Sequence, residues 1–484
     1  MSPDPHHDRR WLILAVIGIA QLLVVLDVTI VNIALPSAQS DLGFSDDQRQ
    51  WIITAYALSF GSLLLLGGRI ADLFGRKWTF IGGLIGFAAA SAIGGAAQSF
   101  ELLVAARATQ GVFAALLAPA ALSLLATTFT DPKERGKAFG VYGAIAGAGS
   151  AVGLLLGGFL TEVLDWRWCL YVSILFAVPA AIGGLRLLHH VPAQNRPRLD
   201  IPGTIVASAG LFSLVYGMAH AESSGWTDPV TLGFLGAAVL LLVGFVVLQQ
   251  RVANPLLPLR VVTDRDRGGA YLAIATAGAG VFGAFLFLTF YMQTIKGFTA
   301  LETGLAFLPM TFAIVTTAAL VNTKLLVRTG PRPLIPTGMV LAATGMALLT
   351  GIGVDTSYVS HLLPSLLLIG VGFGLVVAPS FATATLGVPR QDAGVASAMV
   401  NTSQQIGGSI GTALLSTLAV SATTDFIAQN GPRFAAQAAV EGYTTAFWWA
   451  AGIFAVGAVV TGSLLRSGVR PEMAHGAAPE AVAA

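Results

Sequence analysis

The sequence predicts an all-α membrane protein that crosses a lipid bilayer many times. Of its 484 residues, 55% are hydrophobic and only 10% are charged, and the mean hydropathy is +0.77. A typical soluble domain carries about 25% charged residues, and no single aqueous core could hide this much apolar surface. The apolar residues also form long runs, so the bilayer is the expected solvent.

Fourteen runs have the length of a transmembrane helix, which needs about 20 largely apolar residues. The first run follows the polar segment 1–10 and is too long for the apolar part of a signal peptide, so we interpret it as a retained helix. The segment 466–484 is Ala/Pro-rich and is predicted to be disordered. The expected spans are 11–36, 51–69, 78–97, 101–124, 138–160, 168–188, 201–220, 229–248, 268–292, 303–322, 333–352, 360–386, 394–421 and 441–465.

Two polar linkers divide the spans into groups of six, two and six. The first linker is HHVPAQNRPRLD, near His190, and the second is QQRVANPLLPLRVVTDRDRGG. We predict an N-terminal six-helix bundle (1–190), a two-helix insertion (191–250), and a C-terminal six-helix bundle with a short tail (251–484). Two such bundles are a known transporter architecture.

The basic residues predict the orientation of the spans. An even number of spans places both termini on one side, and loops on the cytoplasmic side are rich in Lys and Arg. Of the 26 basic residues, Arg107 lies inside a span and only Arg49, Arg167, Lys296 and Arg433 fall on the side opposite the termini. The termini are therefore expected to be cytoplasmic.

Asp27 and Arg107 are the two charged residues that lie deep within spans. A charge at mid-bilayer costs about 2.5 kcal/mol or more, and such residues usually have a partner or face a wet cavity. At a rise of 1.5 Å per residue, both lie about 12–13 Å from the outer ends of their helices. We expect them to approach each other, with Asp27 taking up and releasing a proton. The alternative is a static pair that only fixes helix packing.

Several other classes of function find little support in the sequence. Cys169 is the single cysteine, which excludes an internal disulfide and a cysteine-based metal site. No HExxH or Walker A motif is present, and no filter-like repeat indicates an ion channel. The histidine pairs His6–His7 and His189–His190 are interpreted as solvated loops. We expect no metal, no cofactor and no nucleic-acid partner.

The segment GRIADLFGRK follows the second span, in the position of a short cytoplasmic loop. Read alone, it is an ordinary basic turn in which Asp72 could pair with Arg76 or cap a nearby helix. Its pattern GxxxDxxGRK resembles the signature loop of the major facilitator superfamily, apart from Leu73, where many members carry a base. The resemblance implies a cytoplasmic gating role for the residues that match the pattern, which are Gly68, Asp72, Gly75, Arg76 and Lys77.

Four further segments resemble the fourteen-helix drug:proton antiporters of this superfamily. They are LDVTIVNIALP (26–36), WIITAY (51–56), RATQG (107–111) and NTSQQIGG (401–408). In that family the arginine matched by Arg107 is associated with proton coupling. The resemblance implies a major facilitator fold with two additional helices.

A ridge of small residues on the fifth span predicts close helix packing. The family motif has a proline after the glycine matched by Gly153, but Leu154 stands there, and Ser173 and Leu175 replace a common asparagine and proline. These departures weaken the prediction of antiport, but they do not affect the predicted fold. The ridge consists of Gly149, Gly153, Gly157 and Gly158.

Uncharged polar residues within the spans are candidates for a substrate cavity. An interhelical hydrogen bond is the alternative for each of them. Asn32 and Gln110 are favoured, because they share helices with Asp27 and Arg107. Thr29 and Gln405 belong to the same class of residue, and the residues that we assign to the cavity are Gln21, Asn32, Gln110, Gln293, Asn401 and Gln404.

Together these observations predict a proton-coupled secondary transporter that works by alternating access. The family resemblance implies export of drugs, antibiotics or other amphipathic molecules from a bacterial cell, across the inner membrane, by proton antiport. A monomer is expected, with the small molecule, protons and the lipid bilayer as its partners. A proton-coupled importer and a narrow-specificity metabolite exporter stay open as alternatives, and a membrane enzyme is the competing class.

Overall fold

The computed structural model describes residues 9–44, 46–188, 199–321 and 325–467. His6–His7, His189–His190 and most of the first linker and of the C-terminal tail lie outside these ranges. The described residues contain no strand, and fourteen long helices follow the predicted spans in order. They are α1 (Arg10–Leu42), α2 (Asp46–Phe74), α3 (Arg76–Gly95), α4 (Phe100–Thr128), α5 (Pro132–Val163), α6 (Trp168–Leu187), α7 (Ile201–Ser224), α8 (Pro229–Gln249), α10 (Arg265–Phe290), α11 (Ala300–Leu320), α13 (Pro331–Leu349), α14 (Leu363–Ala384), α15 (Ala393–Asn430) and α16 (Ala435–Leu464).

The predicted all-α polytopic fold is confirmed. By length and composition, thirteen of the described helices can cross a membrane, and α5 contains a shorter apolar segment, Val152–Val163. Short helical pieces connect the long helices. They are α9 (Leu259–Thr263), the π-helical turns η1 (Tyr291–Ile295) and η3 (Tyr358–Leu362), α12 (Leu326–Thr329), and the 3₁₀ turns η4 (Arg390–Asp392) and η5 (Pro432–Phe434).

The predicted end of the first span at Pro36 was wrong, because α1 continues to Leu42 with Pro36 inside it. A proline removes one helical hydrogen bond, but packing against neighbouring helices makes this tolerable in membrane helices. Leu35 and Ala38, on either side of the proline, are both buried. The helix ends instead at Gly43, whose left-handed backbone (φ 69°) lets its N–H donate to the carbonyl of Gln39.

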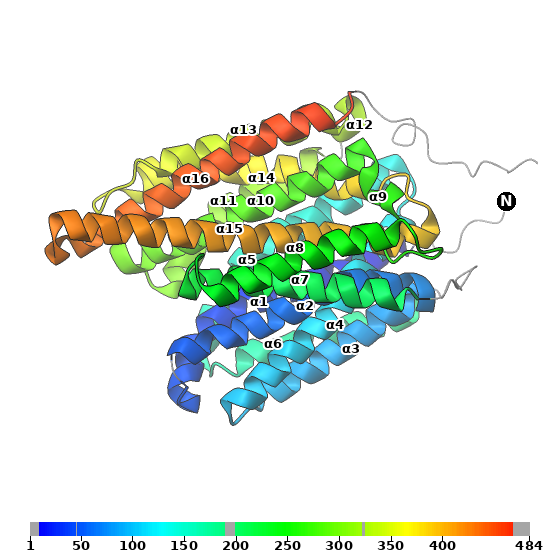
Figure 1. The fold of residues 1–484 in the computed structure, drawn as a ribbon, viewed down its shortest axis with the longest axis horizontal. Coiled ribbons are helices and arrows are strands. Elements are labelled where there is room, and N and C mark those ends of the chain that lie inside the picture. The colour runs from blue at the N-terminus through cyan, green and yellow to red at the C-terminus, as the bar shows by residue number, and fades with distance from the viewer. Residues whose placement is uncertain (1–8, 45, 189–198, 322–324, 468–484) are drawn as a thin grey trace, which may run out of the picture.

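Basic side chains mark one end of the bundle, which we call the basic end. Arg10 pairs with Glu134 there, and Arg265 donates to the carbonyl of Leu464 at 3.1 Å. The first helix therefore begins, and the last one ends, at the same end of the molecule (Figure 1). This common end is the one that the sequence predicts to be cytoplasmic.

The first six helices gather on one side of the molecule, and α10, α11, α13, α14 and α16 on the other (Figure 1). Helices α5 and α11 touch across this division, as do α2 and α15. The hairpin of α7 and α8 also bridges it. Tyr216 of α7 packs against Trp51 of α2, with ring centroids 6.1 Å apart, and the indole N–H of Trp226 donates to Thr417 of α15 at 2.9 Å.

The glycine ridge of α5 packs against α1. A Cβ atom on Gly149 would lie 2.7 Å from Val25, and one on Gly153 would collide with the hydroxyl of Thr29. A Cβ atom on Gly157 would meet Ile30 at 3.0 Å. The absence of side chains along this line lets the two helices approach closely. Gly158 is buried on the same helix.

Candidate functional site

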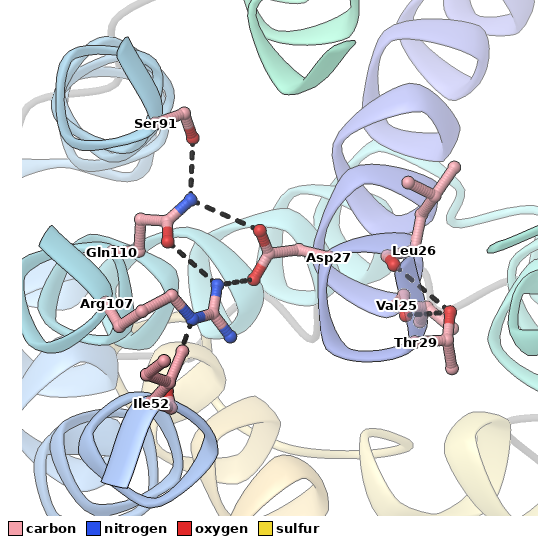
Figure 2. A network of polar contacts seen from close by, with 8 residues as sticks. All are labelled: Val25, Leu26, Asp27, Thr29, Ile52, Ser91, Arg107 and Gln110. Carbon is pink, nitrogen blue, oxygen red and sulfur yellow. Dashed lines mark hydrogen bonds and ion pairs between the residues drawn. The ribbon is translucent and has the colours of Figure 1, made fainter. Parts of the chain in front are cut away.

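Asp27 of α1 and Arg107 of α4 form an ion pair in the interior of the first helix group. Arg107 Nη1 donates to Asp27 Oδ2 at 2.6 Å. The side chain of Asp27 is 0% exposed and that of Arg107 is 2% exposed. The structure therefore brings together the two deep charges, from helices that are far apart in the sequence (Figure 2).

Gln110 forms a hydrogen bond with each of the two charged groups. Its Nε2 atom donates to Asp27 Oδ1 at 3.2 Å, and its Oε1 atom accepts from Arg107 Nη1 at 2.8 Å. The same Nε2 atom donates to Ser91 Oγ of α3 at 2.7 Å. Both carboxylate oxygens are thus hydrogen-bonded, and the amide of Gln110 is fixed in one orientation by Ser91 (Figure 2).

Helix α2 supplies the rest of the arginine's surroundings. Arg107 Nε lies 3.5 Å from the carbonyl oxygen of Ile52, a long hydrogen bond. The guanidinium carbon lies 4.4 Å from the centre of the Tyr56 ring, and aromatic faces attract cations most strongly where water is excluded. The guanidinium therefore contacts a carboxylate, an amide, a carbonyl and an aromatic face at once.

Protonation of Asp27 would alter the contacts that join α1 to α4. A buried ion pair is stable only while both partners are charged and hydrogen-bonded, and loss of one charge leaves the other uncompensated. Protonation of Asp27 would remove the counter-charge of Arg107 and weaken two of the bonds that join α1 to α4. A proton could in this way change the packing of the helices.

Gln21 and Asn32, the other polar candidates on α1, lie apart from this network. Gln21 is buried and accepts a 2.6 Å hydrogen bond from the hydroxyl of Tyr142 on α5. Asn32 is exposed. It follows Asp27 by five residues, which is about 140° around a helix of 3.6 residues per turn. Gln110 therefore joins the charged pair and Asn32 does not.

The candidates in the second half of the chain are half-buried. Asn401 donates to the carbonyl of Ser397 within its own helix at 3.0 Å, and Gln293 lies in the π-helical turn η1. The backbone of Gln404 packs against Gly278 of α10, whereas the side chain of Gln405 packs against Gly61 of α2. Gln405 thus contacts the first helix group.

The expected loop of the GxxxDxxGRK segment was wrong in extent, because α2 continues to Phe74 and α3 begins at Arg76. Gly75 alone connects them. Its φ is 97°, a value that residues other than glycine rarely adopt. Gly68 forms no turn and packs instead on α15, where a Cβ atom would lie 2.6 Å from that of Ala398. Lys77 donates to the carbonyl of Leu185 at 3.0 Å.

Asp72 both pairs with Arg76 and caps a helix, the two contacts that its position in the sequence allowed. Its Oδ1 atom accepts from the backbone N–H of Gly394 at 2.9 Å, and its Oδ2 atom from that of Val395 at 3.2 Å. Arg76 Nη2 lies 3.5 Å from Asp72 Oδ1. The carboxylate therefore caps the N-terminus of α15, where the helix dipole favours a negative charge.

Three more contacts hold the two helix groups together toward the basic end. Arg135 Nη2 donates to Thr385 Oγ1 at 2.8 Å, and Tyr142 packs against Phe381 with ring centroids 5.9 Å apart. A Cβ atom on Gly143 would lie 2.7 Å from that of Ala378. Together with Asp72, these residues join the two groups toward this end.

Ser91 and Tyr142 were not predicted from the sequence as partners of the site residues. Serine and tyrosine are common within membrane helices, so neither stands out from an apolar run as a charge does. Spacing offers no signal either, because Ser91 lies five residues before the loop that begins at Ala96, whereas Gln110 lies eleven residues after the loop ends at Ser99. For metals, the described part of the chain holds no group of three or more His, Cys, Asp or Glu side chains that could bind an ion.

Comparison with known proteins identifies the family. The profile of the Major Facilitator Superfamily matches residues 17–412. The puromycin resistance protein pur8 of Streptomyces alboniger is 52% identical over 471 residues, which cover 96% of this chain and 93% of that protein. The cephamycin export protein CmcT of Amycolatopsis lactamdurans is 38% identical over 84% of each chain.

A solved structure shows the same fold. The crystal structure of the human organic anion transporter MFSD10 matches 94% of this chain and 99% of its own, with a TM-score of 0.66 at 16% identity. The family resemblance inferred from the motifs is thus confirmed, and the chain is a multi-pass membrane protein. It belongs to the Major Facilitator Superfamily of transporters and is of the fourteen-helix type.

Proposed function

We propose that this protein exports amphipathic antibiotics or drugs in exchange for protons. It acts as a monomer in the inner membrane of a bacterium, with both termini in the cytoplasm, so that the basic end faces the cytoplasm. The bundles 1–190 and 251–484 rock about a central site, and 191–250 is inserted between them. The single observation that carries proton coupling is the buried ion pair of Asp27 and Arg107, in which both carboxylate oxygens are hydrogen-bonded.

Asp27 carries the proton, and Arg107 and Gln110 set its environment. With Asp27 ionised, the ion pair and the amide hold α1 against α4. Uptake of a proton from outside releases the guanidinium and favours the rearrangement of these helices. Release of that proton to the cytoplasm restores the pair, so each cycle moves a proton inward.

The names of the relatives support this substrate class. Proteins 52% and 38% identical to this chain are named for puromycin resistance and cephamycin export. Polar side chains within the spans are available to orient such molecules. We assign this role to Gln21, Asn32, Gln293, Asn401 and Gln404, with Gln110 linking the cavity to the proton site.

The residues at the basic end form the cytoplasmic gate. Asp72 caps α15 across the division between the bundles, while Gly68 allows the close approach of α2 to α15. Gly75, Arg76 and Lys77 fix the start of α3 and its contact with α6. With these contacts made, the cytoplasmic side is closed, and breaking them opens the substrate site inward.

The experiment that tests this function is transport in proteoliposomes under an imposed pH gradient. Puromycin and a panel of lipophilic cations are the substrates, and wild type is compared with Asp27→Asn. Asp425→Asn is the matched control, because Asp425 is an exposed residue near the end of α15 that is opposite the basic end.

We expect gradient-driven transport in wild type and in Asp425→Asn. In Asp27→Asn it should be lost, while downhill exchange of substrate survives. Equal gradient-driven transport by Asp27→Asn and wild type would show that the ion pair is only structural. Substrate movement in the same direction as protons would instead identify an importer.

A further inference from the structure

A small apolar pocket lies beside the ion pair, toward the end of the bundle opposite the basic end. Its walls come from α1, α2, α4, α6 and the connection between α5 and α6. They include Val31, Leu35, Ile52, Leu103, Trp166 and Leu170. None of these six residues is more than 5% exposed, and each presents an apolar surface to the pocket.

The sequence register places this pocket directly next to the proton site. Val31 follows Asp27 by four residues and Leu103 precedes Arg107 by four, so each lies one helical turn from a charged residue and on the same helix face. Ile52 also lines the pocket, and its carbonyl oxygen accepts the long hydrogen bond from Arg107 Nε. The pocket is thus the space that adjoins the pair toward the opposite end.

One face of α1 leads from the pair through the pocket to the surface. Asp27, Val31, Leu35, Ala38 and Asp41 succeed one another by three or four residues, which keeps them on one face. From Asp27 to Asp41 the helix rises about 21 Å at 1.5 Å per residue. A buried carboxylate and an exposed one therefore stand at the two ends of an apolar stripe.

Trp166 covers the outer side of this stripe and is held in place by Asp41. The indole N–H donates to Asp41 Oδ2 at 3.2 Å, and Trp166 is only 4% exposed. Arg167 Nη1 donates to the same Oδ2 atom at 2.6 Å, and its Nη2 atom donates to the carbonyl of Ala97 at 3.0 Å. The guanidinium carbon also lies 4.5 Å from the centre of the Trp166 ring.

The charged groups around Trp166 are exposed to water, unlike the buried pair of Asp27 and Arg107. The side chains of Asp41 and Arg167 are 46% and 27% exposed. Asp165, half-exposed, lies 3.8 Å from Arg167. Exposed ion pairs contribute little stability, so the contact of Asp41 with Arg167 can break and re-form at small cost.

We propose that protons reach Asp27 from outside through this stripe, within the N-terminal bundle, and that Trp166 is the plug that closes the route. The inference rests on the proposed proton coupling and specifies where the proton enters. A narrow apolar segment excludes water and so blocks protons. When Asp41 and Arg167 release Trp166, water enters the pocket, and one proton passes from it to the carboxylate of Asp27. Protons would then enter by a route that is separate from the path of the substrate.

A cysteine in the pocket reports whether the plug is closed. We suggest Leu103→Cys in a Cys169→Ser background, with a small cationic thiol reagent added to the outer face and labelling followed by mass spectrometry. The plug is perturbed by Trp166→Ala and, with smaller structural disturbance, by Asp41→Asn. Trp168→Ala is the matched control, because Trp168 is 44% exposed and does not line the pocket.

We expect slow labelling of the Leu103→Cys reporter protein with Trp166 in place. The rate should rise about tenfold in Trp166→Ala, rise less in Asp41→Asn, and stay the same in Trp168→Ala. Fast labelling with Trp166 present would overturn the proposal, as would a rate that neither Trp166→Ala nor Asp41→Asn changes. If Trp166→Ala does not fold, Asp41→Asn alone decides between these results.

Proton flux separates this proposal from the proposed function. With a pH gradient and no substrate, Trp166→Ala proteoliposomes should acidify faster than wild type, and the second change Asp27→Asn should abolish the leak. Faster labelling without any leak would retain the plug as a barrier to the reagent but overturn its role in proton entry. Intact coupled transport in Asp27→Asn would refute proton coupling at Asp27, whatever the labelling shows.

Discussion

The carboxylate of Asp72 accepts the backbone N–H of Gly394 at 2.9 Å, which joins the end of α2 to the beginning of α15 across 322 residues of sequence. The contact depends on the helical state of both partners and on their close approach. It therefore exists only while the two helix groups meet at the basic end.

Replacing Asp72 by alanine should shift the protein toward the state that is open at the basic end. Loss of a capping side chain costs about 0.5–2 kcal/mol, which corresponds to a population shift of roughly two- to thirtyfold. Spin labels at the exposed positions Phe74 and Thr263 report the separation of the two groups by electron spin resonance. We expect a longer distance to gain population, whereas Asp425→Ala should leave the distribution unchanged. An unaltered distribution in Asp72→Ala would contradict the gating role.

The ion pair should show strong coupling in a double-mutant cycle. Arg107→Gln leaves Asp27 buried without its counter-charge, so we expect a loss of about 3–5 kcal/mol. In Asp27→Asn/Arg107→Gln neither charge stays behind, and most of that stability should return without recovery of proton-driven transport. Unfolding in detergent, for wild type and the three variants, measures the coupling free energy. Additive losses in the double variant would show that the two residues act independently.

Ser91 should tune the proton site through Gln110. Ser91→Ala removes the acceptor for Gln110 Nε2, which costs about 1 kcal/mol and lets the amide turn away from Asp27. The pH midpoint of coupled efflux should therefore move, with little change in protein yield. Ser173→Ala is the control: Ser173 is also fully buried, and its hydroxyl has no hydrogen-bond partner among the described residues. A pH profile that shifts equally in both variants would exclude a specific role for Ser91.

The packing of α5 on α1 should be sensitive to a single methyl group. Gly153→Ala directs a Cβ atom into the hydroxyl of Thr29, and overpacking of this kind costs about 1–3 kcal/mol. Thr29→Ala should relieve part of the loss, because it removes that oxygen. Gly233→Ala in α8 meets no atom within 4 Å and should stabilise its helix by about 0.5–1 kcal/mol. Melting temperatures of Gly153→Ala, Gly153→Ala/Thr29→Ala and Gly233→Ala in detergent, against wild type, test this order. A Gly153→Ala protein as stable as wild type would show that the helices can separate without cost.

Hydropathy was sufficient to predict the helices, because each span must bury about 20 apolar residues in lipid whatever its neighbours are. It failed at Pro36 because the end of α1 is decided by packing and by the cap at Gly43. The end of α2 was misplaced for a similar reason. Asp72 and its neighbours are polar enough to read as a loop, yet they continue the helix to reach α15.

The charged part of the site could be predicted for a physical reason. A charge within an apolar span is costly, so Asp27 and Arg107 stand out without any structural information. Neutral partners such as Ser91 and Tyr142 carry no such cost, and their contacts depend on helix rotation and neighbours. The same limit explains Asn32, whose place on α1 turns it away from the pair although it shares the helix.

The hairpin of α7 and α8 has a mechanical consequence for any transport cycle. Tyr216 packs against α2 while Trp226 is hydrogen-bonded to α15, so the hairpin is attached to both helix groups. A rotation of one part relative to the other must stretch, bend or slide this attachment. In the alternating-access cycle that we propose, the hairpin would therefore act as a tether that limits how far the two bundles move relative to each other. Much of α8 faces outward with apolar side chains, so the surrounding lipid would resist movement of this tether, and we expect turnover in the proposed cycle to depend on membrane composition.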